Sequence, residues 1–190
     1  MNIVIFGPPG AGKGTQSKFI ANKFNLYQLS TGDLLREEIK NKTKLGSEIS
    51  SIINSGELVS DKIVNDLIEK FISNDTYKNK IIFDGYPRTI NQAKNLDDLL
   101  KKYKQKINIV LKLSVSLETV KKRIIERQSQ ENRADDNADI AIKRYQTYEK
   151  SSEPVLHYYK QSNLLKVVNG EATISEINSE ISDLIDTIKG

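Results

Sequence analysis

The N-terminal stretch MNIVIFGPPGAGKGTQ constrains the fold more than any other part of the chain. Residues 3–6, IVIF, are apolar without a polar break, which is typical of a strand buried on both faces. The strand must end there, because the next eight residues, GPPGAGKG, contain four glycines and two prolines. Gly7, Gly12 and Lys13 have the spacing G-x-x-x-x-G-K and lie between this strand and a predicted helix.

In this context the spacing predicts a phosphate-binding loop. Glycines let backbone N–H groups turn inward and approach phosphate oxygens, and the following helix directs its positive end to the same place. Lys13 would add a point charge near the terminal phosphates. The Ser or Thr that usually follows the lysine is displaced by one position, because Gly14 precedes Thr15. The alternative is a tight turn with a solvated lysine.

Composition limits the class of protein. The chain has 190 residues, 37% hydrophobic and 28% charged, which fits one folded globular domain. It has no cysteine, which excludes disulfides and thiolate metal sites and favours the cytoplasm. No apolar run approaches the roughly 20 residues of a membrane span, and no basic region precedes the first apolar run as in a signal peptide. The net charge of +4 is too dispersed to indicate nucleic-acid binding. We therefore expect a cytoplasmic protein without nucleic-acid or membrane partners.

Apolar runs alternate with amphipathic ones along the chain. Strands are predicted at 2–6, 27–30, 80–84, 107–113 and 164–168, and helices near 13–24, 31–41, 45–54, 61–73, 89–103, 116–128, 137–159 and 173–188. Strands separated by helices indicate a mostly parallel sheet covered by helices on both faces, an α/β fold. The polar stretch 126–137 is predicted to be a helix end followed by a loop, for which an ordinary surface loop is the alternative.

A second motif, KIIFDG, places Asp84 at the end of an apolar strand. A carboxylate at that edge, near a phosphate loop, can hold Mg²⁺ or its water ligands. Asp-Gly is also a common turn, so this motif is weak when taken alone.

The chain resembles the adenylate kinase family over nearly its whole length. Five motifs occur in the family's order: GPPGAGKGTQ at 7–16, LSTGDLLRE at 29–37, SGELVSD at 55–61, DGYPRTINQA at 84–93 and NRADDN at 132–137. The resemblance implies a P-loop three-layer α/β/α domain with a five-stranded parallel sheet. It also implies a core of 1–29, 60–125 and 137–190, a helical AMP-binding segment at 30–59 and a short lid at 126–136.

The family pattern implies an ATP site and an AMP site. Arg123 would pack against the adenine of ATP, Arg127 would contact the ATP phosphates, and the Ala172 carbonyl would accept from the adenine amino group. The other implied ATP contacts are Gly10, Ala11, Gly12, Lys13, Gly14 and Thr15. The implied AMP contacts are Thr31, Arg36, Glu57, Leu58, Val59, Gly85, Tyr86, Pro87, Arg88, Gln92, Arg133 and Arg144.

Some of these residues are given a more specific role by the resemblance. The Gln92 amide can pair bidentately with adenine. Asp84 would bind Mg²⁺ through water, and Asp135 and Asp136 would orient the lid arginines. The catalytic group would be Lys13, Arg88, Arg127, Arg133 and Arg144. Several of these residues have a simpler explanation that involves no ligand. Ser30 and Asp33 can serve as a capping box of the helix, and Gln92 taken alone would be a surface helix residue. Arg123 and Arg127 share a helix face, which could simply be exposed to solvent.

Three departures from the family pattern stand out. Tyr86 replaces a phenylalanine that is more common in the family, and its hydroxyl is expected to be harmless. Asn132 stands where glycine is common, and asparagine tolerates positive φ. Only QSQEN separates Arg127 from Arg133, which is the short-lid form, so no structural zinc is expected.

The resemblance implies the Mg²⁺-dependent reaction ATP + AMP ⇌ 2 ADP, which serves adenine nucleotide homeostasis and AMP salvage. No exposed apolar stripe stands out in the sequence, so we expect a monomer. A UMP/CMP kinase is the nearest alternative, but its pattern has Ala at the position of Thr31 and Asn-centred residues at that of Gln92. A P-loop switch that binds nucleotide without transfer is the other alternative. The many arginines argue against it, because binding alone does not need so many.

Overall fold

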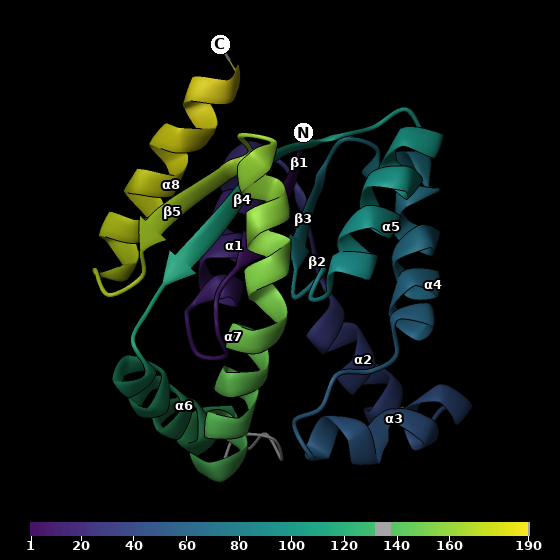
Figure 1. The fold of residues 1–190 in the computed structure, drawn as a ribbon, viewed down its shortest axis with the longest axis vertical. Helices are drawn as coiled ribbons and strands as arrows, with labels where there is room; N and C mark the ends of the chain where they lie inside the picture. The colour runs from purple at the N-terminus through teal and green to yellow at the C-terminus, as the bar shows by residue number, and fades with distance from the viewer. Residues whose placement is uncertain (132–137, 190) are drawn as a thin grey trace.

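The computed structural model describes residues 1–131 and 138–189. Its centre is a five-stranded parallel sheet with the order β2-β3-β1-β4-β5 (Figure 1). The predicted fold class is confirmed, and no observed strand end differs from its predicted position by more than one residue. The strands are β1 (Asn2–Phe6), β2 (Tyr27–Ser30), β3 (Ile81–Asp84), β4 (Ile107–Ser114) and β5 (Leu165–Asn169).

Each predicted helix is also present. They are α1 (Lys13–Phe24), α2 (Thr31–Lys40), α3 (Lys44–Asn54), α4 (Asp61–Ile72), α5 (Ile90–Lys102), α6 (Leu117–Glu131), α7 (Ala138–Gln161) and α8 (Ile174–Lys189). A short 3-10 helix, η1 (Asp75–Tyr77), was not predicted, because three residues are too few to show a periodic pattern. Among the described residues, no helix combines the length and the apolar character needed to cross a membrane.

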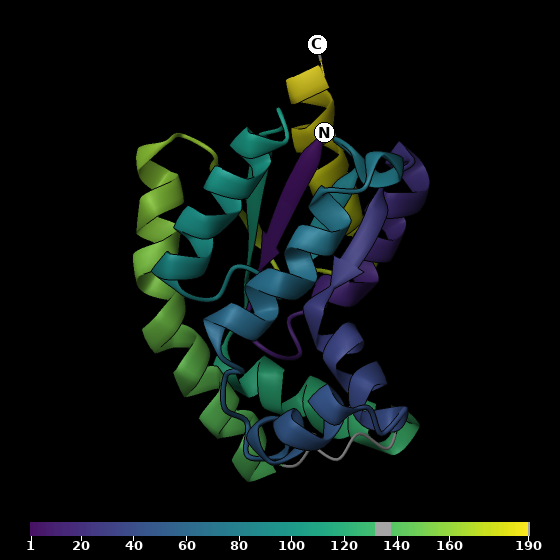
Figure 2. The same cartoon turned by 90° about the vertical axis from the view of Figure 1, so that its right-hand side faces the viewer.

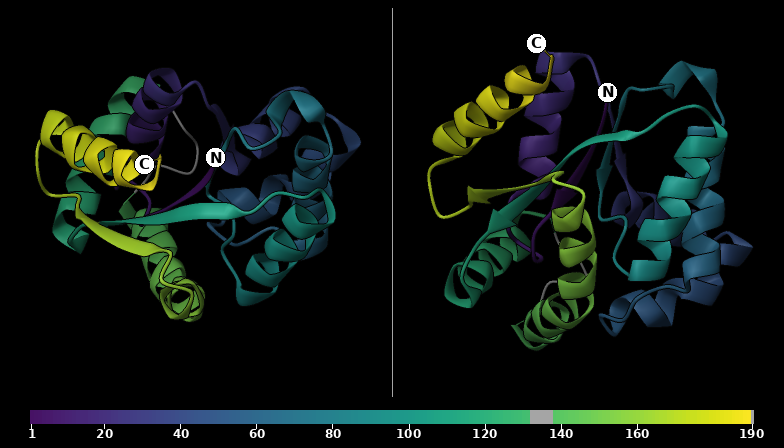
Figure 3. Two further views of the ribbon diagram at one scale, coloured as in Figure 1. Left: turned by 90° about the horizontal axis from the view of Figure 1, so that it is seen from above. Right: turned by 45° about the horizontal axis from the view of Figure 1, so that its top comes forward.

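The two faces of β1 explain why its sequence is apolar throughout. Val4 and Phe6 belong to a core that includes buried side chains of α4, α5 and α7. Ile3 and Ile5 belong to a second core, to which α1 and α8 contribute. The sheet is therefore the middle of three layers, as the view along it in Figure 3 shows.

Because the strands are parallel, their carboxyl ends meet at one edge of the sheet. The helices α2, α3 and α6 and the first half of α7 lie beyond that edge (Figures 1 and 2). β1 and β4 are neighbours in the sheet; the connection after β1 leads towards β2 at one edge, and the connection after β4 leads towards β5 at the other edge. A ligand crevice is expected at this topological switch point.

Two local features bear on the predictions. The Ser30 hydroxyl accepts from the Asp33 N–H at 3.3 Å, so the predicted capping of α2 is present. α6 continues to Glu131, three residues beyond the predicted end at 128. The first part of the predicted lid segment is therefore helical, while residues 132–137 lie outside the described part of the chain.

Candidate active site

Residues 7–12 form the loop that joins β1 to α1. Gly12 is the N-cap of α1 with φ 90°, and Gly10 has φ 78°, a region that side chains other than glycine rarely adopt. The first turn of α1 contains no acidic residue that could compete for its N–H groups. The loop therefore presents a helix N-terminus suited to an anion, as its sequence predicts.

Lys13 folds back onto this loop. Its Nζ donates to the Gly7 carbonyl at 2.7 Å and to the Pro8 carbonyl at 3.0 Å. Burial lowers the pKa of Lys13 to about 8; Asp84 opposes this shift, while Arg88, Arg144 and Arg127 add to it. The lysine therefore lies within the field of three guanidinium groups, an arrangement that a bound polyanion would relieve.

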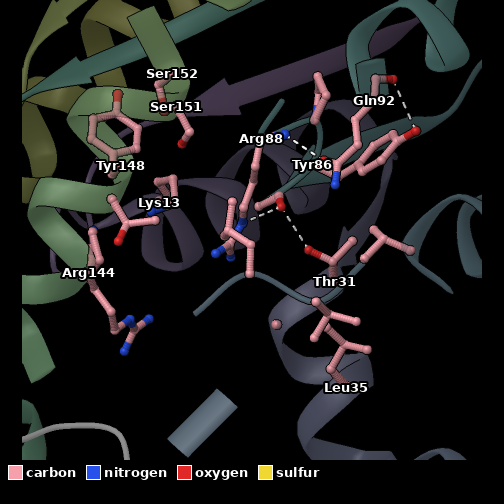
Figure 4. A pocket seen from close by; sticks show the side chains of 18 of the residues that line it. Lys13, Thr31, Leu35, Tyr86, Arg88, Gln92, Arg144, Tyr148, Ser151 and Ser152 are labelled. Carbon is pink, nitrogen blue, oxygen red and sulfur yellow. Dashed lines mark hydrogen bonds between the residues drawn. The ribbon is translucent and has the colours of Figure 1, made fainter. Parts of the chain in front are cut away.

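Two of these arginines reach the crevice from different elements (Figure 4). Arg88 follows β3, and its Nε donates to the Gly85 carbonyl at 2.8 Å. Arg144 projects from α7. Gly85 has φ 80°, and a Cβ there would lie 2.9 Å from the Thr31 Oγ1 and 3.1 Å from the Arg88 guanidinium. The absence of a side chain at Gly85 thus makes room for both neighbours.

Asp84 lies at the carboxyl end of β3 and is 7% exposed. Gln28 Nε2 donates to its Oδ2 at 3.1 Å. Burial raises the pKa of the Asp84 carboxyl, Lys13, Gln28 and Arg88 oppose the rise, and Asp33 adds to it. Asp33, which the sequence identifies only as a capping residue of α2, is thus close enough for its charge to raise the pKa of the Asp84 carboxyl.

A crevice with a cavity volume of about 120 Å³ lies beside Lys13. Its walls are α2, the turn before α4, the loop after β3, and α7. It brings together all the residues of the predicted AMP set that lie in the described chain: Thr31, Arg36, Glu57, Leu58, Val59, Gly85, Tyr86, Pro87, Arg88, Gln92 and Arg144.

Gln92 is 2% exposed, so it is not the surface helix residue that its sequence alone would suggest. Its side-chain amide bonds to the backbone of Arg88 and to Asp61. The Tyr86 hydroxyl lies nearby; it donates to Asn65 Oδ1 at 2.7 Å and accepts from Asn95 Nδ2 at 3.2 Å. The hydroxyl that departs from the family pattern thus links α4 to α5.

The predicted ATP residues outside 10–15 lie on α6 and in the turn after β5. Arg123 of α6 donates to the Gly170 carbonyl at 2.9 Å and to the Ala11 carbonyl at 3.4 Å. It therefore connects α6 with the phosphate loop and with the turn that contains Ala172. Arg127 follows one turn later on the same helix.

A family model described as adenylate kinase matches residues 5–164. The chain is also 41% identical to an adenylate kinase of Pelagibacter ubique, over 97% of this chain and 99% of the relative. The chain belongs to the adenylate kinase family. Other family members, from Azobacteroides pseudotrichonymphae and Bacteroides fragilis, are 42% and 40% identical over 99% of this chain and at least 98% of their own length.

Some predicted residues of the family pattern lie outside the described chain: Arg133, Asp135 and Asp136. Other residues of the crevice were missed, among them Leu35 of α2, Ile53 of α3 and Val64 of α4. A further group comes from α7, where Thr147, Tyr148, Ser151 and Ser152 line the crevice together with Arg144 (Figure 4). Their spacing from Arg144 is three, four, seven and eight residues, which is one face of a helix. That periodicity was available in the sequence once Arg144 had been singled out.

Proposed function

We propose that this chain is an adenylate kinase that catalyses ATP + AMP ⇌ 2 ADP with Mg²⁺. Membership of the family over nearly the whole chain supports the reaction. The observation that carries it is that Lys13, Arg88 and Arg144 line one crevice beside the phosphate loop, with Arg127 near enough to contribute to the lowered pKa of Lys13. Binding one nucleotide does not require that many cations, whereas joining two anionic nucleotides does.

The reaction depends on neutralising the negative charge of the two nucleotides more than on proton transfer. The AMP phosphate is ionised near neutral pH, so its oxygen can attack the γ-phosphorus of ATP as the bond to the β–γ bridging oxygen breaks. ADP leaves, and the AMP phosphate has become the second ADP. Lys13 and the arginines counter the repulsion between the two anions and the charge of the transferred phosphoryl group.

The two nucleotides are assigned to the two sides of the phosphate loop. We place AMP in the crevice, its phosphate near Arg36, Arg88 and Arg144 and its base near Gln92. We place the ATP phosphates on residues 10–15, and its adenine between Arg123 and Ala172. Arg133, Asp135 and Asp136 complete this assignment from the lid, in accordance with the family pattern.

The carboxylates of Asp84 and Asp33 suit a divalent cation. Asp84 is a buried carboxylate whose raised pKa shows that its charge is costly there, and Asp33 is close enough to contribute. Hard cations prefer such oxygen ligands, and Mg²⁺ usually keeps several waters. We propose that Asp84 and Asp33 hold Mg²⁺ through its waters, where it would neutralise phosphate charge.

Exclusion of water is the remaining requirement, because water would otherwise accept the phosphoryl group. We propose that segments 30–59 and 126–136 close over the nucleotides, while 1–29, 60–125 and 137–190 form the core. We expect a monomer in the cytoplasm, a location that the absence of cysteine favours.

The test is ADP formation by the purified protein. ADP should form from ATP plus AMP and not from ATP alone, and the acceptor panel AMP, CMP, UMP and GMP should favour AMP. Lys13→Met should lower turnover by several orders of magnitude, since it removes a charge from the transferred group. Lys18→Met is the matched control, because Lys18 is an exposed lysine on the same helix. Normal turnover by folded Lys13→Met would contradict the assignment, and a preference for UMP or CMP would indicate a UMP/CMP kinase.

A further inference from the structure

The amide of Gln92 is held between two groups of opposite hydrogen-bonding character. Its Oε1 accepts from the backbone N–H of Arg88 at 2.7 Å, and its Nε2 donates to Asp61 Oδ1 at 2.7 Å. The side chain is almost fully buried. Both bonds are short, and both are partly buried.

These two partners permit only one orientation of the amide. A carboxylate can only accept, and a backbone N–H can only donate. If the amide turned by 180°, its oxygen would face the Asp61 carboxylate and its NH₂ would face the Arg88 N–H. Both bonds would be replaced by repulsive contacts, and the buried groups would be left unpaired.

Asp61 is itself fixed in place. It is the first residue of α4, and its second oxygen accepts from the Thr89 hydroxyl at 3.0 Å. Thr89 caps α5 by accepting from the Gln92 N–H at 3.2 Å. The carboxylate therefore joins the start of α4 to the start of α5. It is not among the side chains that line the crevice, so it acts on the base through Gln92.

The geometry points to Asp61 as a positioning residue that selects 6-aminopurines over 6-oxopurines. This inference rests on the proposed function. The locked amide keeps one N–H and one lone pair for the base, in a fixed order. Adenine offers N1 as an acceptor and N6–H₂ as a donor, which matches this order. Hypoxanthine offers N1–H as a donor and O6 as an acceptor, and requires the orientation that Asp61 forbids.

The test uses AMP and inosine monophosphate, its 6-oxo analogue, as acceptors with ATP. Asp61→Asn preserves the shape but can donate as well as accept, so it releases the constraint on one side of the amide. The AMP/IMP ratio of kcat/KM should fall about 10-fold, within the range that one bidentate pair provides. Most of the change should be a higher KM for AMP and a lower KM for IMP, because Asp61 is remote from the transferred phosphoryl group.

Asp66→Asn is the matched control, since it makes the same change at an exposed position of α4 and should leave the ratio unaltered. Thermal unfolding of both variants separates loss of fold from loss of selection. Asp61→Ser carries the same test if the asparagine variant does not fold. An equal loss of kcat/KM for AMP and IMP, or an unchanged ratio, would overturn the inference. Failure of the unaltered protein to phosphorylate AMP would instead overturn the proposed function.

Discussion

Lys13 is the residue at which function and stability oppose each other. Its pKa of about 8 lies below the ordinary lysine value of 10.5, chiefly because of burial. Between these values the unfolded chain binds the proton and the ligand-free folded protein releases it, so folding becomes more favourable as pH rises. Relative to Lys13→Met, the free energy of unfolding should increase by about 1 kcal/mol from pH 8 to pH 9.

Urea unfolding of both proteins at several pH values measures this difference and cancels the other groups that titrate. A difference that is flat or that falls above pH 8 would show that Lys13 does not carry a lowered pKa. Bound ATP should remove the effect, because its phosphates favour the charged lysine.

Tyr86 shows how a departure at one residue is accommodated. The sequence predicts only that its hydroxyl is tolerated, whereas the structure gives it Asn65 and Asn95 as partners. Tyr86→Phe leaves both amides without this partner and should cost about 1–2 kcal/mol of stability. Tyr27→Phe, at an edge strand where the ring is 36% exposed, should change stability by less than about 0.5 kcal/mol. Equal effects of the two changes in denaturant unfolding would mean that the Tyr86 hydroxyl bonds contribute nothing.

The pairing of α2 with α3 depends on Gly46, where the two helices meet. A Cβ at this position would lie 2.0 Å from the Glu38 carbonyl oxygen, which belongs to the backbone of α2 and cannot turn aside. Gly46→Ala should therefore push the helices apart, at a cost of about 1–3 kcal/mol. Since α2 carries Thr31 and Arg36, KM should rise for AMP more than for ATP. Ser51→Ala, on the exposed side of α3, is the control. An unchanged KM for AMP would show that this helix pair does not shape the AMP site.

The elements themselves were largely predictable, and the reasons are local. β1 is apolar on both faces and is followed by glycines, so its end and the phosphate loop follow from neighbouring residues. Asp61 could not be assigned in this way. Its partner Gln92 lies 31 positions away, and the contact exists only because α4 and α5 lie side by side. Asn65 and Tyr86, 21 positions apart, were missed for the same reason.

At the scale of the whole molecule, the parallel sheet brings distant cations to one edge. Lys13 of α1, Arg88 of the loop after β3 and Arg144 of α7 bring charge into one crevice. A dinucleotide of two adenosines joined by a polyphosphate would fill both proposed sites. As one molecule it would lose the entropy of association once, whereas two separate nucleotides would lose it twice. At about 100 times its Kd it should stabilise the fold by about 2.7 kcal/mol, measured as a rise in Tm.

At equal concentration the linked dinucleotide should raise the Tm more than ATP or AMP alone, and added salt should reduce its effect because the attraction is between charges. Lys13→Met should lose most of the gain, while Lys18→Met should keep it. If the dinucleotide stabilised the protein no more than ATP does, the two proposed sites would not be adjoining. The cations would then serve one nucleotide, and transfer between two would have no structural basis in this crevice.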